Sequence, residues 1–496
     1  MNKVSGIRDQ IIQELPLWDQ PSISVGIVKD GKVVLAEGFG YADVEKNEKA
    51  NQETMYQIGS CSKAFTAAAV ALLVDQGKLQ WDRPVQDYMP WLEFKDPFTT
   101  AHVTVRDLLC HRTGLPRHDA YWINGPWTRR EMAENLRNME PAWSFRSHWC
   151  YQNTCYVAAG MLIEEVSGMS WEDFVRVNLL EPLEMTRTTF YVDAIRGDEN
   201  HAEPYSRLLP TDMKGYEKTS FLKSDREDME KGVGAPYGPA GSIMSTVTDM
   251  CKWVLFNLQE GKVGDRQLIS EENMKELPKP QMLLSEPLLV PFPEQDFYSY
   301  GLGWFIETYR GHKMVEHGGN IDGFSALVTM LPDMDLGVVC LTNFNNSFNT
   351  YASTYEILDA YLGESNGEWH QRWRKIIGDM FAANPENMKA MNGEAVPGTT
   401  PSHPLKDFVG TYHNACYGDI VISEHEDGLH FLYNKEESPL AHFHYDTFQI
   451  HNPKALFADM NLRFNTDRKG AVDGIEFGIT LDPAAKDEYF VRKREA

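Results

Sequence analysis

The chain has 496 residues, a length that predicts two or three domains rather than one core. Hydrophobic residues make up 42% and charged residues 24%, as in ordinary globular proteins, and no apolar run approaches the ~20 residues needed to span a bilayer. The formal net charge of −25 argues against a nucleic-acid partner, because an acidic surface repels phosphate backbones.

The N-terminal segment and the cysteines bear on the cellular compartment. Acidic residues interrupt the apolar ones in residues 1–20, so we predict no secretory signal and a cytoplasmic protein. The seven cysteines are scattered and odd in number, which argues against a secreted disulfide framework. Cys150 and Cys155 lack a second close pair, so buried free thiols are favoured over a zinc site.

The first predicted elements are strands followed by a helix. Residues 23–43 contain two apolar runs around Asp30-Gly31, a pattern typical of a β-hairpin, and a third strand is predicted at 55–58. Apolar residues then repeat at helical spacing from Phe65 onward, and Gly77 ends that helix.

The middle of the chain is mainly helical, and strands return after residue 300. Helices are predicted at 105–110, 129–138, 154–167, 171–178 and 246–260. Strands are predicted at 303–308, 313–317, 324–331 and 336–343. Strands at both ends of a helical middle predict an α+β fold, in which one antiparallel sheet is assembled from the chain ends and flanked by helices.

The last part of the chain differs in composition and in its predicted elements. Helical structure is predicted over 351–381 with a break at 363–367, and residues 386–404, rich in Asn, Pro, Gly and Thr, are predicted to be a linker. Short strand-like runs follow at 408–412, 419–424, 429–433, 441–445, 447–451, 462–466, 474–479 and 488–493. Such runs predict a small antiparallel barrel. The predicted domains are therefore 1–385 and 405–496, joined by the linker.

One pair of histidines lies in the predicted barrel. His442 and His444 stand two apart on a strand and would share one face, which would allow a metal site. Solvated or packed histidines are the favoured interpretation.

Candidate chemistry begins at Ser60-Cys61-Ser62-Lys63, at the start of the first strong helix. Positions i and i+3 share a helix face, so the Lys63 amine can reach the Ser60 hydroxyl, which needs a base to become nucleophilic. Burial near a helix N-terminus disfavours an ammonium, and the same helix end offers the Ser60 N–H to an oxyanion. Taken alone, this common motif favours a helix-capping serine and a solvated lysine.

A second motif, Tyr151-Gln152-Asn153, stands just before a predicted helix. The Tyr151 phenol could share protons with Ser60 and Lys63, and Asn153 could offer its amide to a substrate carbonyl. In isolation, a core tyrosine beside a helix-capping asparagine explains the same residues.

A third motif, His317-Gly318-Gly319, lies at the end of a predicted strand. The small glycines would let a substrate lie along the strand edge, and the N–H of Asn320 could complete an oxyanion hole. An ordinary glycine turn is the alternative.

Together with the segments between them, these motifs resemble the class C β-lactamase and penicillin-binding-protein-like serine hydrolases. The resemblance covers roughly residues 23–343, and further matching segments are 104–115, 145–160, 181–185, 239–249 and 300–304. It implies an antiparallel sheet flanked by helices, with an all-helical subdomain and a cleft between the two. The catalytic set that it implies is Ser60, Lys63, Tyr151, Asn153 and His317, with Gly318, Gly319 and Asn320 binding the substrate.

Residues 405–496 resemble the lipocalin-like domain attached to some members of that family. In those members the domain can help to assemble oligomers or to shape the cleft, and a tethered stability module with no direct role is an equal alternative.

His317 departs from the β-lactamase pattern, in which a lysine meets the substrate carboxylate. A histidine of ordinary pKa, near 6.5, would be mostly neutral at pH 7. Members with His-x-Gly at this position are largely esterases, D-amino-acid peptidases and amidases. We therefore do not expect an efficient β-lactamase.

These observations predict a serine hydrolase that cleaves a small peptide, amide or ester through a Ser60 acyl-enzyme, with a peptidase or amidase slightly ahead of an esterase. The alternatives are a carboxylesterase or acyltransferase on the same scaffold, or a binding or sensor protein that is acylated without turnover. Lys63 and Tyr151 share the general-base role, and the sequence does not divide it between them. We expect a small-molecule or short-peptide substrate, no cofactor or metal, no nucleic-acid or membrane partner, and allow a homo-oligomer formed through the barrel.

Overall fold

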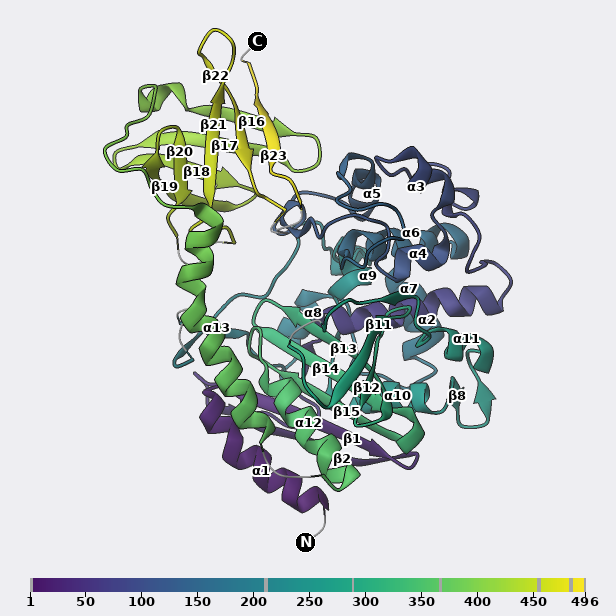
Figure 1. Cartoon of the computed structure of the whole chain (residues 1–496). Helices are drawn as coiled ribbons and strands as arrows, with labels where there is room; N and C mark the ends of the chain where they lie inside the picture. The colour runs from purple at the N-terminus through teal and green to yellow at the C-terminus, as the bar shows by residue number, and fades with distance from the viewer. Residues whose placement is uncertain are drawn as a thin grey trace.

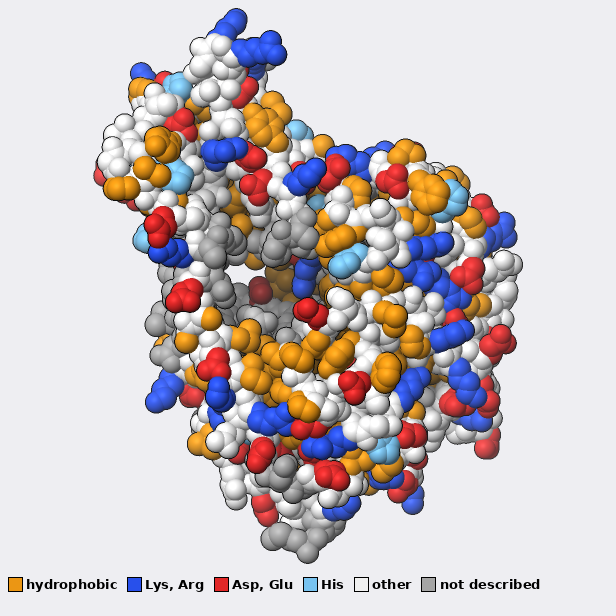
Figure 2. Space-filling model, viewed as in Figure 1, with side chains coloured by type: hydrophobic (Ala, Val, Ile, Leu, Met, Phe, Trp, Pro, Cys, Tyr) orange, Lys and Arg blue, Asp and Glu red, His pale blue; other side chains and the backbone are white. Residues whose placement is uncertain are grey.

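The computed structural model describes residues 3–208, 213–287, 290–364, 368–452, 456–480 and 485–494; within 384–391, side chains are described only at Glu386 and Lys389. A larger domain and a small β-barrel are joined by a long helix (Figure 1). A hollow separates the barrel from the larger domain on one face, and hydrophobic side chains gather on the larger domain beside it (Figure 2). No helix in these ranges is long and apolar enough to cross a membrane.

A nine-stranded antiparallel sheet forms the centre of the larger domain, in the order β10-β11-β12-β13-β14-β15-β1-β2-β3. Its strands are β1 (Ser22–Lys29), β2 (Lys32–Asp43), β3 (Glu48–Lys49), β10 (Met282–Leu283), β11 (Gln295–Tyr300), β12 (Phe305–Tyr309), β13 (His312–Ile321), β14 (Phe324–Leu331) and β15 (Leu336–Thr342). Asp30 and Gly31, with φ angles of 51° and 71°, make the predicted hairpin turn. Because β1 pairs with β15, the sheet joins strands from both ends of the domain, as predicted.

Helices cover both faces of this sheet (Figure 1). One face packs against α1 (Lys3–Trp18), α12 (Asn349–Leu362) and α13 (Trp369–Asn392). The other packs against α2 (Ser62–Asp75) and α10 (Val247–Leu258). The contact with α10 is close, since a Cβ at Gly26 would lie 2.4 Å from the Sγ atom of Cys251. Any side chain at Gly26 would therefore push α10 away from β1.

An all-helical part stands beside the sheet. It comprises α2 with α4 (Val105–Leu109), α5 (Arg129–Glu134), α6 (Asn153–Ser167), α7 (Trp171–Val175) and α9 (Gly238–Gly241). The outer helices are α3 (Pro97–His102), α8 (Val192–Gly197) and α11 (Glu271–Glu276). The buried helix α6 begins at a cap from Gln152, whose side chain accepts a hydrogen bond from the Thr154 N–H, and ends at Gly168 with φ 73°.

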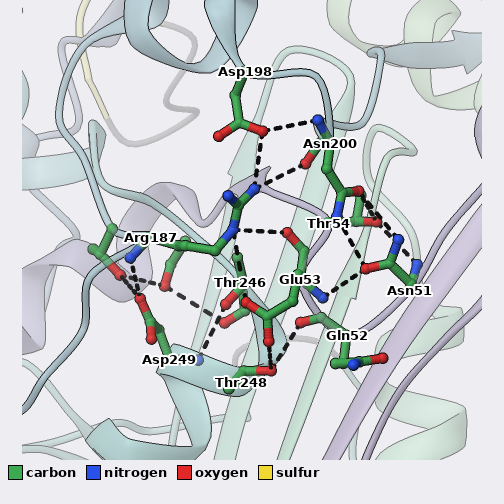
Figure 3. Close-up of polar contacts among 12 residues, drawn as sticks. Asn51, Gln52, Glu53, Thr54, Arg187, Asp198, Asn200, Thr246, Thr248 and Asp249 are labelled. Atoms are coloured by element: carbon green, nitrogen blue, oxygen red, sulfur yellow. Dashed lines mark hydrogen bonds and ion pairs between the residues drawn. The ribbon is translucent and has the colours of Figure 1, made fainter.

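A polar cluster around Arg187 fixes the chain just before Ser60 (Figure 3). The guanidinium donates to Asp198 Oδ1 at 2.9 Å and to the Glu53 carbonyl at 3.1 Å, while the Arg187 backbone N–H donates to Asp249 Oδ2 at 2.8 Å. The next residues form β4 (Tyr56–Gln57), the predicted third strand. It pairs with β7 (Met244–Ser245) in a separate small sheet rather than with the hairpin.

The C-terminal part is a closed barrel of eight antiparallel strands, as predicted. They are β16 (Gly410–Asn414), β17 (Gly418–His425), β18 (Gly428–Tyr433), β19 (Glu436–His444), β20 (Thr447–Ile450), β21 (Asn461–Thr466), β22 (Val472–Phe477) and β23 (Glu488–Arg492). Pairing of β16 with β23 closes the ring, and buried aromatic residues such as Phe431, Phe464 and Phe477 fill it.

Two helices differ from the sequence expectation. Helix α13 continues to Asn392 and so includes the first residues of the predicted 386–404 linker, because the Ala, Met and Lys residues there are good helix formers. Helix α1 was not predicted, although Ile7, Ile11, Leu15 and Trp18 repeat at helical spacing and are all buried. The domain boundaries at 385 and 405 stay a prediction.

Two buried glutamates lie on neighbouring strands near the site. Glu307 on β12 and Glu316 on β13 are 8% and 6% exposed, and they accept hydrogen bonds from Gln295 Nε2 and Thr329 Oγ1 at 2.9 and 3.0 Å. Burial raises the pKa of Glu316 to about 7 and, together with the Glu316 charge, raises the pKa of Glu307 well above its usual 4.5.

This pair predicts that Glu316→Gln stabilises the protein at alkaline pH. A carboxyl whose pKa is raised by folding binds its proton more tightly in the folded state, so stability is full below about pH 4.5 and falls as the pH rises through about 7. The variant's melting temperature should therefore fall less than that of the native protein between about pH 6 and 8.5, by about 1 °C for each kcal/mol of relief. The exposed Glu230→Gln is the control; parallel melting curves for the native protein and Glu316→Gln would contradict the expectation.

Candidate active site

Ser60 sits in a tight turn between β4 and α2. The turn Gly59–Cys61 is a short 3₁₀ helix, and Gly59 has φ 50°, a backbone conformation that favours glycine. The Ser62 hydroxyl donates to the Gly59 carbonyl at 2.7 Å and accepts from the Ile243 N–H at 3.0 Å. These bonds fix the turn, so the half-buried Ser60 side chain is presented from the beginning of α2.

The Lys63 amine lies directly beside the Ser60 hydroxyl. The Nζ–Oγ distance is 3.0 Å, and Nζ also donates to Asn153 Oδ1 and to the Ala240 carbonyl, both at 2.7 Å. Lys63 is fully buried, and this burial lowers the pKa of its amine well below the usual 10.5. A neutral amine has two hydrogens and one lone pair. In the neutral form, donation to these two oxygens would leave the lone pair toward Ser60, as a general base requires.

Tyr151 approaches the same pair from the other side. Its phenol interacts with Ser60, which offsets part of the effect of burial on the phenol's pKa, and its ring centroid lies 4.7 Å from Lys63 Nζ. Burial raises the pKa of the phenol above its usual 10, so Tyr151 keeps its proton at neutral pH. The sequence did not distinguish Lys63 from Tyr151 as the general base. In the structure, Lys63 is suited to accept a proton, and Tyr151 to pass one on.

Asn153 holds Lys63 in place. Its Oδ1 accepts from Lys63, and its Nδ2 donates to Asp119 Oδ1 at 2.8 Å. The orientation of the amide follows from these partners. Asn153 is 6% exposed, so orienting Lys63 is the role that its contacts support, and donation to a substrate carbonyl stays a prediction.

Asp119 is a site residue that the motifs did not predict. It lies 34 residues before Asn153 along the chain, and only the fold brings the two together. The sequence carried no signal for it beyond its place in a loop.

The His317 imidazole is turned into the protein. Its Nδ1 lies 2.6 Å from the Gly318 carbonyl, which can only accept, so Nδ1 carries the proton. Its Nε2 lies 3.0 Å from the Tyr300 hydroxyl and accepts from it. Burial, followed by the nearby Lys63, lowers the pKa of His317 to about 3. The side chain is neutral, as expected, but it does not have the ordinary pKa near 6.5 used in the sequence analysis.

The end of β13 runs along the Ser60 turn. A Cβ at Gly319 would lie 1.9 Å from the Ile58 carbonyl oxygen, so glycine permits this close approach. Asn320 opposes Ser325 next to the Ile321–Phe324 pair that closes the hairpin. Hydrogen bonding alternates along an antiparallel pair, which points the Asn320 N–H away from β14 and toward the turn. That the N–H groups of Ser60 and Asn320 form an oxyanion hole stays a prediction.

A cavity of about 470 Å³ opens at these residues. Its lining consists of Ser60, Arg117, Trp149, Cys150, Tyr151, Phe305, His317, Gly318, Asn320, Asn346, Ser347, Phe348 and Tyr351. Five of these thirteen residues are Trp, Tyr or Phe, and Arg117 supplies a cation. The described residues of the loops 119–128 and 203–235 contribute none of this lining, and residues 209–212 lie outside the described part of the chain.

The barrel holds the one group of potential metal ligands found among the described residues: His425, His430 and Glu437. His430 lies between two carboxylates, with Nε2 3.0 Å from Asp427 and Nδ1 3.3 Å from Glu437.

The histidine pair considered from the sequence is arranged differently. The pairing of β19 with β20 shifts register between His442 and His444, so the two do not occupy alternate positions of a regular strand. His442 Nε2 instead lies 2.8 Å from the Tyr445 carbonyl oxygen.

Comparison with known proteins places this geometry in context. A family model described as Beta-lactamase matches residues 9–361, and one described as a domain of unknown function, DUF3471, matches residues 394–492. Unguisins hydrolase ungD of Aspergillus violaceofuscus is 29% identical over 455 residues, which cover 85% of this chain and 77% of the relative. Protein flp of Staphylococcus aureus is 28% identical, over 68% of this chain and 63% of its own.

Solved structures share the fold. An octameric penicillin-binding protein homologue from Pyrococcus abyssi superposes with a TM-score of 0.62 at 24% identity, covering 99% of this chain and 100% of the other. The D-amino acid amidase of Ochrobactrum anthropi, complexed with D-phenylalanine, gives a TM-score of 0.56 at 22% identity, covering 73% of this chain and 99% of the other.

Proposed function

Because the chain belongs to the beta-lactamase family, we propose that it is a serine hydrolase that cleaves a small peptide or amide substrate through an acyl-enzyme on Ser60. The observation that carries this proposal is the Lys63 amine, buried, lowered in pKa and 3.0 Å from the Ser60 hydroxyl. The relative named as a hydrolase supports hydrolysis as the reaction class.

The proposed reaction begins when Lys63 takes the Ser60 proton and Oγ attacks the substrate carbonyl. The N–H groups of Ser60 and Asn320 stabilise the oxyanion. The tetrahedral intermediate then expels the amine, which receives a proton through Tyr151 and Lys63, and leaves an ester on Ser60. Water then attacks that ester while Lys63 accepts its proton; as the acyl–Oγ bond breaks, Lys63 returns the proton to Ser60 Oγ and the acid is released.

Proton delivery is our reason for placing amides ahead of esters. An amine is a poor leaving group unless it is protonated, whereas an activated ester releases its alcohol without such help. Tyr151 interacts with Ser60 and keeps its proton at neutral pH, so it is suited to protonate the leaving group. Acyl transfer and an oligomer formed through the barrel stay predictions.

The neutral, inward-facing His317 gives a prediction about penicillin. Because the pKa of His317 is lowered to about 3, acylation by benzylpenicillin should not accelerate as the pH falls from about 8 to 5.5. Protonation of Lys63 should slow it instead. Stopped-flow acylation across this range measures the effect, and an acid-side rise that disappears in His317→Asn would contradict the assignment.

A panel of L- and D-aminoacyl anilides and p-nitrophenyl esters tests the proposed function. We expect at least one anilide to give product well beyond one equivalent of protein, since a non-turnover binding protein would stop after a single acylation. A burst of one equivalent with no further product would favour that alternative, and turnover of esters alone would favour a carboxylesterase.

A further inference from the structure

The segment 117–123 lies between the catalytic lysine and the barrel. On one side, Asp119 accepts from Asn153 Nδ2 at 2.8 Å and from Trp122 Nε1 at 2.9 Å, both at Oδ1, and its other oxygen pairs with Arg117. The chain of contacts from Asp119 through Asn153 therefore ends at Lys63 Nζ. The same segment starts a short 3₁₀ turn, Asp119–Tyr121, whose carbonyls need partners outside the turn.

The Tyr121 carbonyl accepts from Trp127 Nε1 at 2.9 Å, and the barrel adds further contacts to the segment. Asn434, in the turn between β18 and β19, donates from Nδ2 to the Ile123 carbonyl at 2.8 Å, and its Nδ2 lies 3.4 Å from the carbonyls of Ala120 and Tyr121. Asn434 adopts a φ of 50°, which places its side chain over the end of the 3₁₀ turn in a conformation that asparagine tolerates better than most residues.

A second barrel contact holds the start of the segment. The Tyr417 hydroxyl lies 2.5 Å from His118 Nδ1, and both side chains are buried. A neighbouring bond, from Asn135 Nδ2 to the Cys416 carbonyl at 2.7 Å, fixes the barrel turn that carries Tyr417. The segment is thus attached to the barrel at both of its ends and to Asn153 in its middle.

We propose that the barrel is a positioning device for the active site. Asn434 and Tyr417 hold residues 118–123 in place, so that Asp119 keeps Asn153 in position. Asn153 in turn keeps Lys63 aligned with Ser60. Asp119, Asn434 and Tyr417 are positioning residues, because they act through Asn153. This inference rests on the proposed function and gives a role to the contacts between the barrel and this segment. A small displacement matters here, since about 1 Å of misalignment can cost about 100-fold in rate.

Asp119 also bears on the pKa of Lys63. Burial lowers that pKa most, the Asp119 charge raises it, and the Arg117 charge lowers it further. Removing the Asp119 charge should lower the pKa of Lys63 further. In the pH profile of Asp119→Asn, the acid limb, where the acylation rate falls as Lys63 is protonated, should therefore move to lower pH. A residue with a purely structural role would leave this limb in place.

The test uses the full chain and the rate at which a fluorophosphonate labels Ser60, which does not depend on knowing the substrate. Asn434→Ala and Tyr417→Phe each remove one barrel contact, and Asn465→Ala on β21 is the matched barrel control. We expect labelling to slow by about tenfold or more in both variants, with the anilide kcat falling in parallel and KM staying within about twofold. Asn465→Ala should label at the native rate.

The outcomes separate this inference from the proposed function. If the native protein is not labelled at Ser60, the proposed function fails. If the native protein is labelled and the double variant Asn434→Ala/Tyr417→Phe, folded by circular dichroism, is labelled at the native rate, the positioning role is overturned. An unshifted acid limb in Asp119→Asn, with an unchanged rate, would likewise overturn it.

Discussion

Replacing Ser60 with alanine should lower hydrolysis by at least ~1,000-fold while the melting temperature changes little. The side chain is half-buried and presented at the start of α2, and its hydroxyl contacts Lys63 and Tyr151 rather than the structural bonds of the turn. Those structural bonds belong to Ser62, which donates to the Gly59 carbonyl. Loss of the Ser60 oxygen therefore removes the nucleophile without removing support from the fold.

A second serine in the same cavity provides the matched control. Ser347 lines the cavity, but its hydroxyl donates to Gln20 Oε1 at 2.8 Å and does not contact Lys63. Ser347→Ala should keep activity within about threefold of native, as expected for a change away from the reacting atoms. Hydrolysis by Ser60→Ala near the native rate would show that another residue is the nucleophile.

Replacing Lys63 with methionine should cost at least ~100-fold in the rate of Ser60 acylation, the usual effect of losing a general base. Methionine is close to lysine in length and places no charge in the fully buried site. In the native protein the acylation rate should rise with pH as Lys63 loses its proton, with a midpoint below the usual 10.5 because burial lowers its pKa. The pH profile of fluorophosphonate labelling measures both effects.

Lys63→Arg distinguishes a base from a fixed positive charge. An arginine stays protonated at all working pH values, so it cannot accept the Ser60 proton. If Lys63 acts as the base, Lys63→Arg should be as slow as Lys63→Met. Substantial activity in the arginine variant alone would mean that a permanent cation suffices, and would contradict the assigned role.

The sequence predicted the elements whose signals are local. The Asp30-Gly31 turn and the alternation of 324–331 predicted strands that β2 and β14 confirm, and the short runs after residue 405 predicted a closed eight-stranded barrel. Motif order predicted the family, which the family match confirms. Each of these features depends on residues close together in the chain, where propensity and spacing act directly.

The features that the sequence did not predict depend on tertiary contacts. Asp119 reaches Asn153 only because the barrel and α6 hold its loop between them, and no spacing rule connects Asn434 to the Ile123 carbonyl. The pKa of His317 was misjudged because its value is set by burial, and burial is a property of the folded chain.

The most direct test of the proposed acyl-enzyme is to trap the acyl group and find the atom that carries it. The protein is mixed with a slowly hydrolysed anilide, quenched in acid within seconds, digested and mapped by mass spectrometry. We expect one acyl adduct, on Ser60, and none in Ser60→Ala. Decay of this adduct should release the acid product at the rate of turnover. An adduct on Ser62 or a cysteine, or full turnover with no adduct on any residue, would contradict it.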